Sequence, residues 1–193
     1  MANMNKPFGL RPMGNLSATG AQKQYGYQIA DNQSGAIFQG DLVVVYDGYI
    51  IKYDAATHTA PTGVFNGCQY LDPTRANKPT WKNYYPGSVD ITQGQIDCEV
   101  VDDPSQLFLI QAAGTIAQAD IGKNADPTAS TTGDTTTGIS NATLGTPAKT
   151  AALTMKIVGL SNAPDNALGQ YAVMVVKLNQ HQYGSVGVAA DGA

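Results

Sequence analysis

The sequence predicts an all-β protein, a small barrel or sandwich of about seven to nine short strands with an extended N-terminal arm and long loops. Two observations support this class. Fourteen of the fifteen acidic residues are Asp, and 21 Gly and 10 Pro accompany them, a composition that favours turns over helix interiors. The apolar runs are instead rich in Val, Ile and Tyr, residues that fit a pleated sheet.

The strongest local signal is a β-hairpin. Residues 42–46 and 49–53 are two runs of β-branched, aliphatic and aromatic side chains, joined by Asp47-Gly48. Asp-Gly between such runs favours a two-residue turn, because both turn residues need positive φ. The sequence therefore predicts two adjacent antiparallel strands here.

The other predicted strands are short and bounded by Gly, Pro, Asn or Asp: residues 25–29, 62–70 with a glycine bend or bulge, 81–85, 95–101, 106–111, 151–159 and 171–178. In one of them Ile96, Cys98 and Val100 alternate with Asp97 and Glu99, which predicts a strand with one buried and one wet face. The run 106–111 predicts a strand buried on both faces, and residues 112–123 have the helix propensity for one short helix.

We expect three parts along the chain. Residues 1–20 are predicted to form the extended arm, 21–180 the barrel or sandwich domain, and 181–193 a flexible tail. Within the domain, residues 126–149 are predicted to form a long loop of Thr, Ser, Gly and Ala. Loops of this length are typically disordered or functional. The arm carries the apolar residues Phe8, Leu10, Met13 and Leu16, so we expect it to lie across another surface.

Charge is sparse and unevenly distributed. Charged residues make up 13% of the chain, and Lys6, Arg11 and Lys23 are the only charged side chains before Asp31. A basic arm thus precedes an acidic body. This is too little positive charge for nucleic-acid binding, so we predict no direct nucleic-acid partner. We also expect no signal peptide and no membrane segment, and synthesis in the cytosol with reduced thiols.

The sequence suggests no catalytic chemistry, and we predict no enzyme, no cofactor and no metal site. His58 and His181 lie outside any nucleophile or zinc motif and are interpreted as solvated. Cys68 and Cys98 are interpreted as small buried hydrophobes. Asp102-Asp103-Pro104 fits a turn better than a calcium loop.

The aromatic residues leave two interpretations open. The ten Tyr and Trp81 suit a sugar-binding face, and they equally suit a core and subunit interfaces. In a β protein with few charges, the interface interpretation is favoured.

Several segments resemble capsid decoration (cement) proteins of tailed bacteriophages and related phage virion structural proteins. They are, in order, Pro7-Phe8-Gly9-Leu10-Arg11-Pro12, Gly40-Asp41-Leu42-Val43-Val44, Asp47-Gly48, Pro61-Thr62-Gly63-Val64-Phe65, Asp102-Asp103-Pro104, Phe108-Leu109-Ile110-Gln111 and Ile121-Gly122-Lys123-Asn124-Ala125-Asp126. The resemblance covers residues 6–126 with gaps. Residues 67–100 and 126–149 make this chain longer than the smallest such proteins.

The resemblance implies a protein that binds the outside of an assembled icosahedral capsid, often as a trimer, and that has no catalytic residues. The implied partners are the major capsid protein and further copies of the chain. The implied location is the outer capsid surface of the virion, after synthesis in the host cytoplasm. We expect the arm residues Phe8, Leu10, Arg11, Met13 and Leu16 to form the protein interface.

Two alternatives remain. A carbohydrate-binding or adhesion module displayed on a virion would use exposed aromatics and the 126–149 loop. A tail-tube-like structural subunit is also built from small β domains, and the sequence separates it poorly from a decoration protein.

Overall fold

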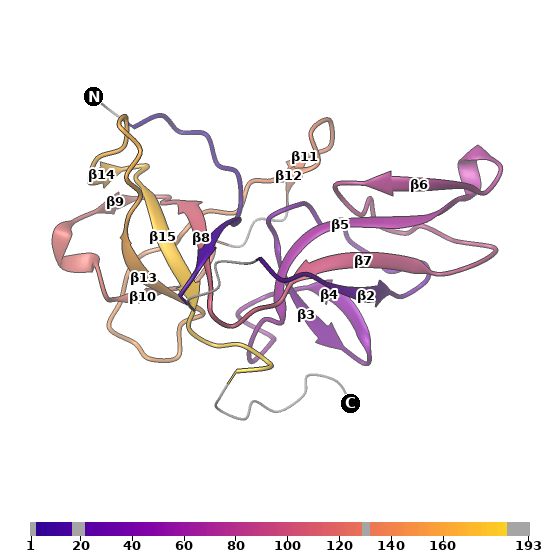
Figure 1. The fold of residues 1–193 in the computed structure, drawn as a ribbon, viewed down its shortest axis with the longest axis horizontal. Helices are drawn as coiled ribbons and strands as arrows, with labels where there is room; N and C mark the ends of the chain where they lie inside the picture. Colours follow the sequence, from indigo (N-terminus) through magenta and orange to yellow (C-terminus); the bar gives the residue numbers. More distant parts are fainter. Residues whose placement is uncertain (1–2, 17–21, 129–131, 185–193) are drawn as a thin grey trace.

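The computed structural model describes residues 3–16, 22–128 and 132–184 (Figure 1). The predicted all-β class is confirmed: the described residues form antiparallel sheets, with only two single-turn 3-10 helices, η1 (Pro73–Arg75) and η2 (Gln118–Asp120). Ten of their strands have four or more residues, and five are two-residue pairings. The parts of the predicted arm and tail at 1–2, 17–20 and 185–193 lie outside the described residues.

One half of the molecule is a six-stranded sheet (Figure 1). Its strands are β2 (Tyr25–Ile29), β3 (Leu42–Tyr46), β4 (Tyr49–Lys52), β5 (Gly63–Asp72), β6 (Lys78–Lys82) and β7 (Ile96–Val101). The spatial order is β2-β7-β5-β3-β4, and β6 also pairs with β5. The end strands β2 and β4 contact each other, so the sheet curls towards a barrel. Phe65, Cys68 and Tyr85 are among the side chains of its buried core.

The other half is a five-stranded sheet in the order β1-β8-β15-β13-β10. Its strands are β1 (Arg11–Asn15), β8 (Gln106–Gln111), β15 (Val173–Leu178), β13 (Met155–Leu160) and β10 (Asn124–Ala125). Two small pairs complete the structure: β9 (Thr115–Ile116) with β14 (Gly169–Gln170), and β11 (Gly133–Asp134) with β12 (Ile139–Ser140).

The predicted hairpin is confirmed as β3 and β4. Asp47 has φ 48° and Gly48 has φ 82°, so both turn residues are left-handed, as the Asp-Gly pair predicts. Tyr46 then pairs with Tyr49 across the turn.

Strands β5 and β7 follow the sequence pattern closely. The register of β5 on β7 shifts between Phe65 and Gly67, which is the predicted bulge. In β7 the predicted alternation holds, since Ile96 and Cys98 are buried while Asp97 is exposed. This strand thus presents one apolar face to the barrel interior and one polar face to solvent.

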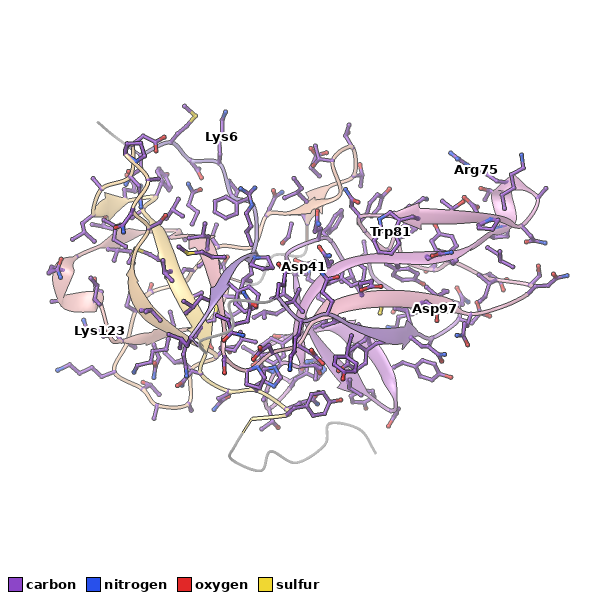
Figure 2. All side chains as sticks on the ribbon, in the orientation of Figure 1. Lys6, Asp41, Arg75, Trp81, Asp97 and Lys123 are labelled. Carbon is purple, nitrogen blue, oxygen red and sulfur yellow. The ribbon has the colours of Figure 1, made fainter. Side chains whose placement is uncertain are left out.

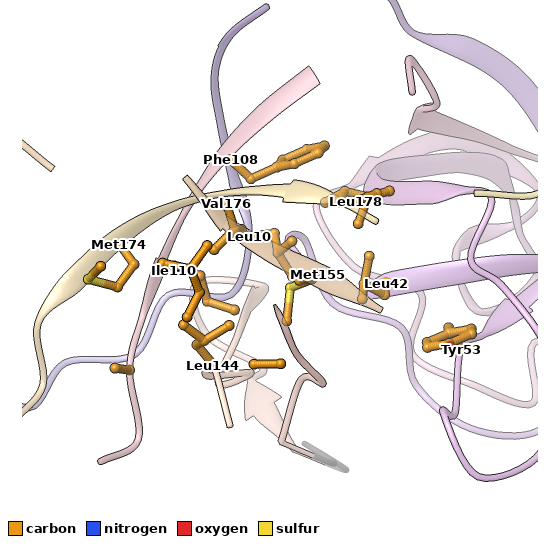
Figure 3. Packing of buried hydrophobic residues seen from close by; sticks show 14 of the residues in the cluster. Leu10, Leu42, Tyr53, Phe108, Ile110, Leu144, Met155, Met174, Val176 and Leu178 are labelled. Atoms are coloured by element: carbon orange, nitrogen blue, oxygen red, sulfur yellow. The ribbon is translucent and has the colours of Figure 1, made fainter. Parts of the chain in front are cut away.

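The two sheets share a second hydrophobic core (Figure 3). The side chains that meet there come from both sheets: Leu42, Val44, Val64 and Val101 from the barrel, and Phe108, Ile110, Met155, Met174, Val176 and Leu178 from the five-stranded sheet. Leu10, directly before β1, is only 2% exposed and lies among Ile110, Met155 and Val176. The N-terminal segment is therefore part of this core.

Two local predictions were wrong. Residues 112–123 form β9 and η2 instead of an α-helix. The Asp120 carboxylate accepts from the Ala117 N–H and closes a tight turn, and Gly122, with φ 88°, directs the chain out of that turn. The predicted strand 81–85 is displaced towards the N-terminus as β6, and Tyr85 instead pairs with Ile37 in an isolated bridge.

The segment 126–149, predicted as a polar loop that is disordered or functional, is tied into the fold. It contains β11 and β12, and Leu144 is fully buried in the shared core. The Leu144 N–H donates to the Gln111 carbonyl, and the Ala113 N–H donates to the Leu144 carbonyl. One large apolar residue thus anchors a stretch whose composition is otherwise that of a loop; residues 129–131 lie outside the described residues.

The first residues of the predicted tail also fold back. His181 is 4% exposed, and the Gln182 N–H donates to the Pro61 carbonyl at 2.9 Å. The Gln182 side chain donates to the Val45 carbonyl at 3.1 Å. Residues 181–184 therefore cover one end of the barrel.

Replacing Leu10 by Ala tests whether the N-terminal segment belongs to the core. We expect Leu10→Ala to lower the free energy of unfolding by about 2–5 kcal/mol, because it leaves a cavity between the sheets. Met13→Ala, three residues away and exposed, is the matched control, with an expected change within about 0.5 kcal/mol. Urea denaturation measures both, and equal small effects would mean that residue 10 contributes nothing to the core.

Candidate interaction surface

The structure separates the five predicted interface residues into two groups. Leu10 is buried and Phe8 is half-buried, so both are occupied by contacts within the chain. Arg11 is exposed, as are Met13 (56%) and Leu16 (57%). These last three lie on or directly after β1, the outer strand of the five-stranded sheet, and we call them the β1 edge.

Two buried glutamines hold the segment that carries the β1 edge. The Gln111 side-chain amide donates to the Met4 carbonyl at 2.8 Å and accepts from the Lys6 N–H at 3.0 Å. At the other end of β8, the Gln106 amide donates to the Gly14 carbonyl at 2.6 Å. The described part of the predicted arm, residues 3–16, is thus a clamped segment, and its β1 forms the edge strand of the chain's own sheet.

Sequence reasoning missed these clamps, although the sequence carries a signal for them. Gln106 and Gln111 close both ends of an otherwise apolar strand. A buried side-chain amide needs hydrogen-bond partners, and the adjacent backbone supplies acceptors for both side chains and a donor for Gln111.

The β1 edge is shaped for docking through side chains. Pro12 lacks an N–H, and the pairing of β1 with β8 shifts between Pro12 and Gly14, so the strand offers an irregular outer ladder. The Arg11 guanidinium lies over the Phe8 ring, 4.9 Å from its centroid. This contact holds one positive charge at the start of β1, the strand that also exposes Met13.

The turn at Gly40-Asp41 joins the N-terminal segment to the barrel. The Leu10 N–H donates to the Gly40 carbonyl at 2.9 Å. The buried Asp41 carboxylate accepts from the Phe38 N–H at 2.9 Å and from the Ser140 hydroxyl, and Lys52 Nζ lies 2.8 Å from its Oδ2. Both carboxylate oxygens thus have partners within the chain, and Asp41 stabilises the fold through them.

A cavity of about 570 Å³ opens beside this turn, between the two halves. Its walls include Tyr53 and Pro127 as well as the carboxylates of Asp41, Asp54 and Asp126. Asp126 Oδ1 accepts from the N–H and the hydroxyl of Thr154 at 2.8 and 2.7 Å. The size falls within the range of small-molecule pockets, but these carboxylates already have partners within the chain.

The Asp102-Asp103-Pro104 turn is confirmed as a turn. Asp103 Oδ1 accepts from the Ser105 N–H at 2.8 Å, and the Asn15 amide donates to Asp103 Oδ2. Asp102 accepts from the Tyr27 hydroxyl at 2.8 Å. The pKa of Tyr27 is raised, mainly by burial and in second place by this hydrogen bond.

Both cysteines are buried and free, as predicted. Cys68 of β5 stands directly opposite Cys98 of β7 in the antiparallel register. Burial raises the pKa of Cys68 to about 12, and it also raises the pKa of Cys98. Both thiols are therefore protonated and unreactive at neutral pH.

The interpretation of His181 as solvated is wrong. Its ring is buried, and Nδ1 accepts from the Tyr183 N–H at 3.0 Å. Burial lowers the pKa of His181, although Asp102 and Asp103 partly oppose this. His58 is half-buried near the rings of Tyr46 and Tyr53, and its Nδ1 accepts from the Asp54 N–H at 3.0 Å.

Among the described residues, no group of three or more His, Cys, Asp or Glu side chains is placed to hold a metal ion. The same part of the chain holds no helix with the length and apolar character needed to cross a bilayer. Comparison with protein-family models, curated proteins and solved structures finds no match.

The buried His181 predicts a specific pH dependence of stability. Because its pKa is lowered in the folded state, the unfolded chain binds the proton more readily below the ordinary value of about 6.5. Stability is therefore full above that pH and falls as the pH drops towards 5. Asp72, Asp120 and Asp134 also have lowered pKa values, but their contribution is lost only below about pH 4.

We expect the free energy of unfolding of the wild-type chain to fall more between pH 7.5 and pH 5.5 than that of His181→Gln. Gln keeps a polar side chain and does not titrate in this range. Urea denaturation at the two pH values measures the difference. An equal decrease in both proteins would contradict a buried neutral imidazole.

Proposed function

We propose that this chain is a structural protein of tailed-phage virions that binds the outer surface of the icosahedral capsid as a decoration protein. In this proposal it is a homotrimer, its partner is the major capsid protein, and it performs no catalysis. The observation that carries the proposal is the β1 edge, where Arg11, Met13 and Leu16 are exposed. The segment that carries it is held by Gln111 at Met4 and Lys6, before β1, and by Gln106 at Gly14, within β1. The sequence resemblance to decoration proteins supplies the identity of the partner.

The physical properties of the β1 edge suit this role. Exposed Met and Leu with one Arg form a small apolar surface with a positive charge, a composition enriched at protein interfaces. The clamped backbone lowers the entropy lost on binding, compared with an arm that orders only on contact. A weak contact of this kind gains strength when several copies in a trimer bind the same capsid.

Surface substitutions at the β1 edge test the proposal without disturbing the core. We expect Arg11→Glu/Met13→Asp to lose capsid decoration, because it places two negative charges where a basic and apolar contact is needed. Val158→Asp, an exposed apolar residue on β13, is the matched control and should decorate like wild type. Occupancy on capsids that lack the protein is measured by gel densitometry and electron microscopy.

Undiminished decoration by the folded double variant would contradict the role of the β1 edge. Antibody labelling of virions in negative stain distinguishes the capsid from the tail, and label along the tail would favour the tail-tube alternative. Mass measurement of the purified protein tests the trimer, and a monomer would contradict that part of the proposal.

A further inference from the structure

The outer face of the barrel sheet carries a row of exposed side chains across four strands. Trp81 of β6 pairs with Gln69 of β5, Gln69 with Asp97 of β7, and Asp97 with Gln28 of β2. Residues paired across antiparallel strands point to the same side, so these four side chains share one face. All four are exposed (Figure 2 labels Trp81 and Asp97). We call them the Trp81 row.

Trp81 lies at one end of the row and packs against the sheet. A Cβ on Gly67 would lie 2.6 Å from Cζ2 of the indole, so the ring packs directly against the bare backbone of that glycine. Half of the side chain remains exposed. An indole fixed on one side and open on the other offers a surface for stacking.

The positions beside the row on the same face carry glycine or a polar side chain. The next pairs on the same face join Gly67 of β5 to Glu99 of β7, and Glu99 to Gly26 of β2. A Cβ on Gly26 would meet nothing within 4 Å. Asp97 Oδ1 accepts from the Gln95 amide at 2.8 Å, which orients its carboxylate. The result is a shallow strip with an aromatic end and side-chain amides and carboxylates along its length.

We propose that the Trp81 row binds a neutral oligosaccharide chain. A sugar ring presents an apolar face of C–H groups, which stacks on an indole, and a rim of hydroxyls that both donate and accept hydrogen bonds. Gln69 and Gln28 supply donors and acceptors, and Asp97 and Glu99 supply acceptors. Neighbouring strands lie about 4.8 Å apart, so the row presents a new polar group at intervals close to the length of a pyranose ring.

The charges of this face select against other ligands. Its only charged residues within the paired positions are Asp97 and Glu99, which disfavour an anionic polysaccharide or nucleic acid. Lys78 and Lys82 alternate with Trp81 along β6 and belong to the opposite face, where Lys82 lies over the rings of Tyr70 and Tyr84.

This site is separate from the β1 edge. The Trp81 row lies on the barrel sheet, whereas the β1 edge lies on the outer strand of the five-stranded sheet. Capsid binding and sugar binding can therefore succeed or fail independently.

The chain offers a direct assay, because Trp81 is its only tryptophan. The intact protein is titrated with neutral hexasaccharides of glucose, mannose, galactose and N-acetylglucosamine while Trp emission is recorded. We expect a saturable change in emission with at least one of them. Gln69→Ala should weaken that affinity about tenfold, since one hydrogen-bonding side chain of the row is lost.

Calorimetry extends the test to variants without the fluorophore. Trp81→Ala should lose binding, whereas Lys78→Ala, on the same strand but the opposite face, should bind like wild type. Thermal unfolding shows that each variant is folded. The proposal is overturned if no neutral hexasaccharide changes the emission at millimolar concentration, if folded Trp81→Ala binds like wild type, or if only a sulfated hexasaccharide or hexalysine binds.

Discussion

Gly40 and Asp41 join four separate segments of the chain at one turn. The Gly40 carbonyl accepts from the Leu10 N–H, and the Gly40 N–H donates to the Phe65 carbonyl of β5. The Asp41 carboxylate binds the Ser140 hydroxyl of β12 and pairs with Lys52 of β4. With φ 92°, and with its Cβ position only 3.1–3.2 Å from the Leu10 and Phe8 backbone, residue 40 must be glycine for the N-terminal segment to approach this closely.

This junction determines where the N-terminal segment lies on the molecule. Leu10 enters the shared core beside the turn, and from there the chain continues into β1, which leaves Arg11, Met13 and Leu16 at the surface. The β1 edge is thus preformed, and its position is fixed by the same contacts that hold the two sheets together. A preformed surface loses little conformational entropy on binding, which suits the weak, repeated capsid contact that we propose.

The sequence predicted the elements whose signals are local. Asp47-Gly48 specifies its own turn, and the alternation in residues 96–100 specifies a buried and a wet face without reference to any other strand. What it did not predict depends on distant partners. The burial of His181 depends on where the chain end folds back, and the order in 126–149 depends on a core that receives Leu144.

The candidate surfaces show the same division. The residues expected at the interface lie in one segment, but no local pattern separates Leu10, which faces the core, from Met13, which faces solvent. The Trp81 row exists only through three strand registers, one of which includes the Gly67 bulge. Registers between strands distant in sequence are set by tertiary packing, so a single aromatic residue in the sequence gives no indication of its neighbours.

Native-state hydrogen exchange at the Leu10 amide tests most directly whether the N-terminal segment is part of the folded unit in the free protein. We predict that this amide, bonded to the Gly40 carbonyl, exchanges as slowly as the amides of β8 and β15, because all of them need the shared core to open. Exchange of the Leu10 amide at the rate of an unstructured peptide, while β8 and β15 stay protected, would contradict it.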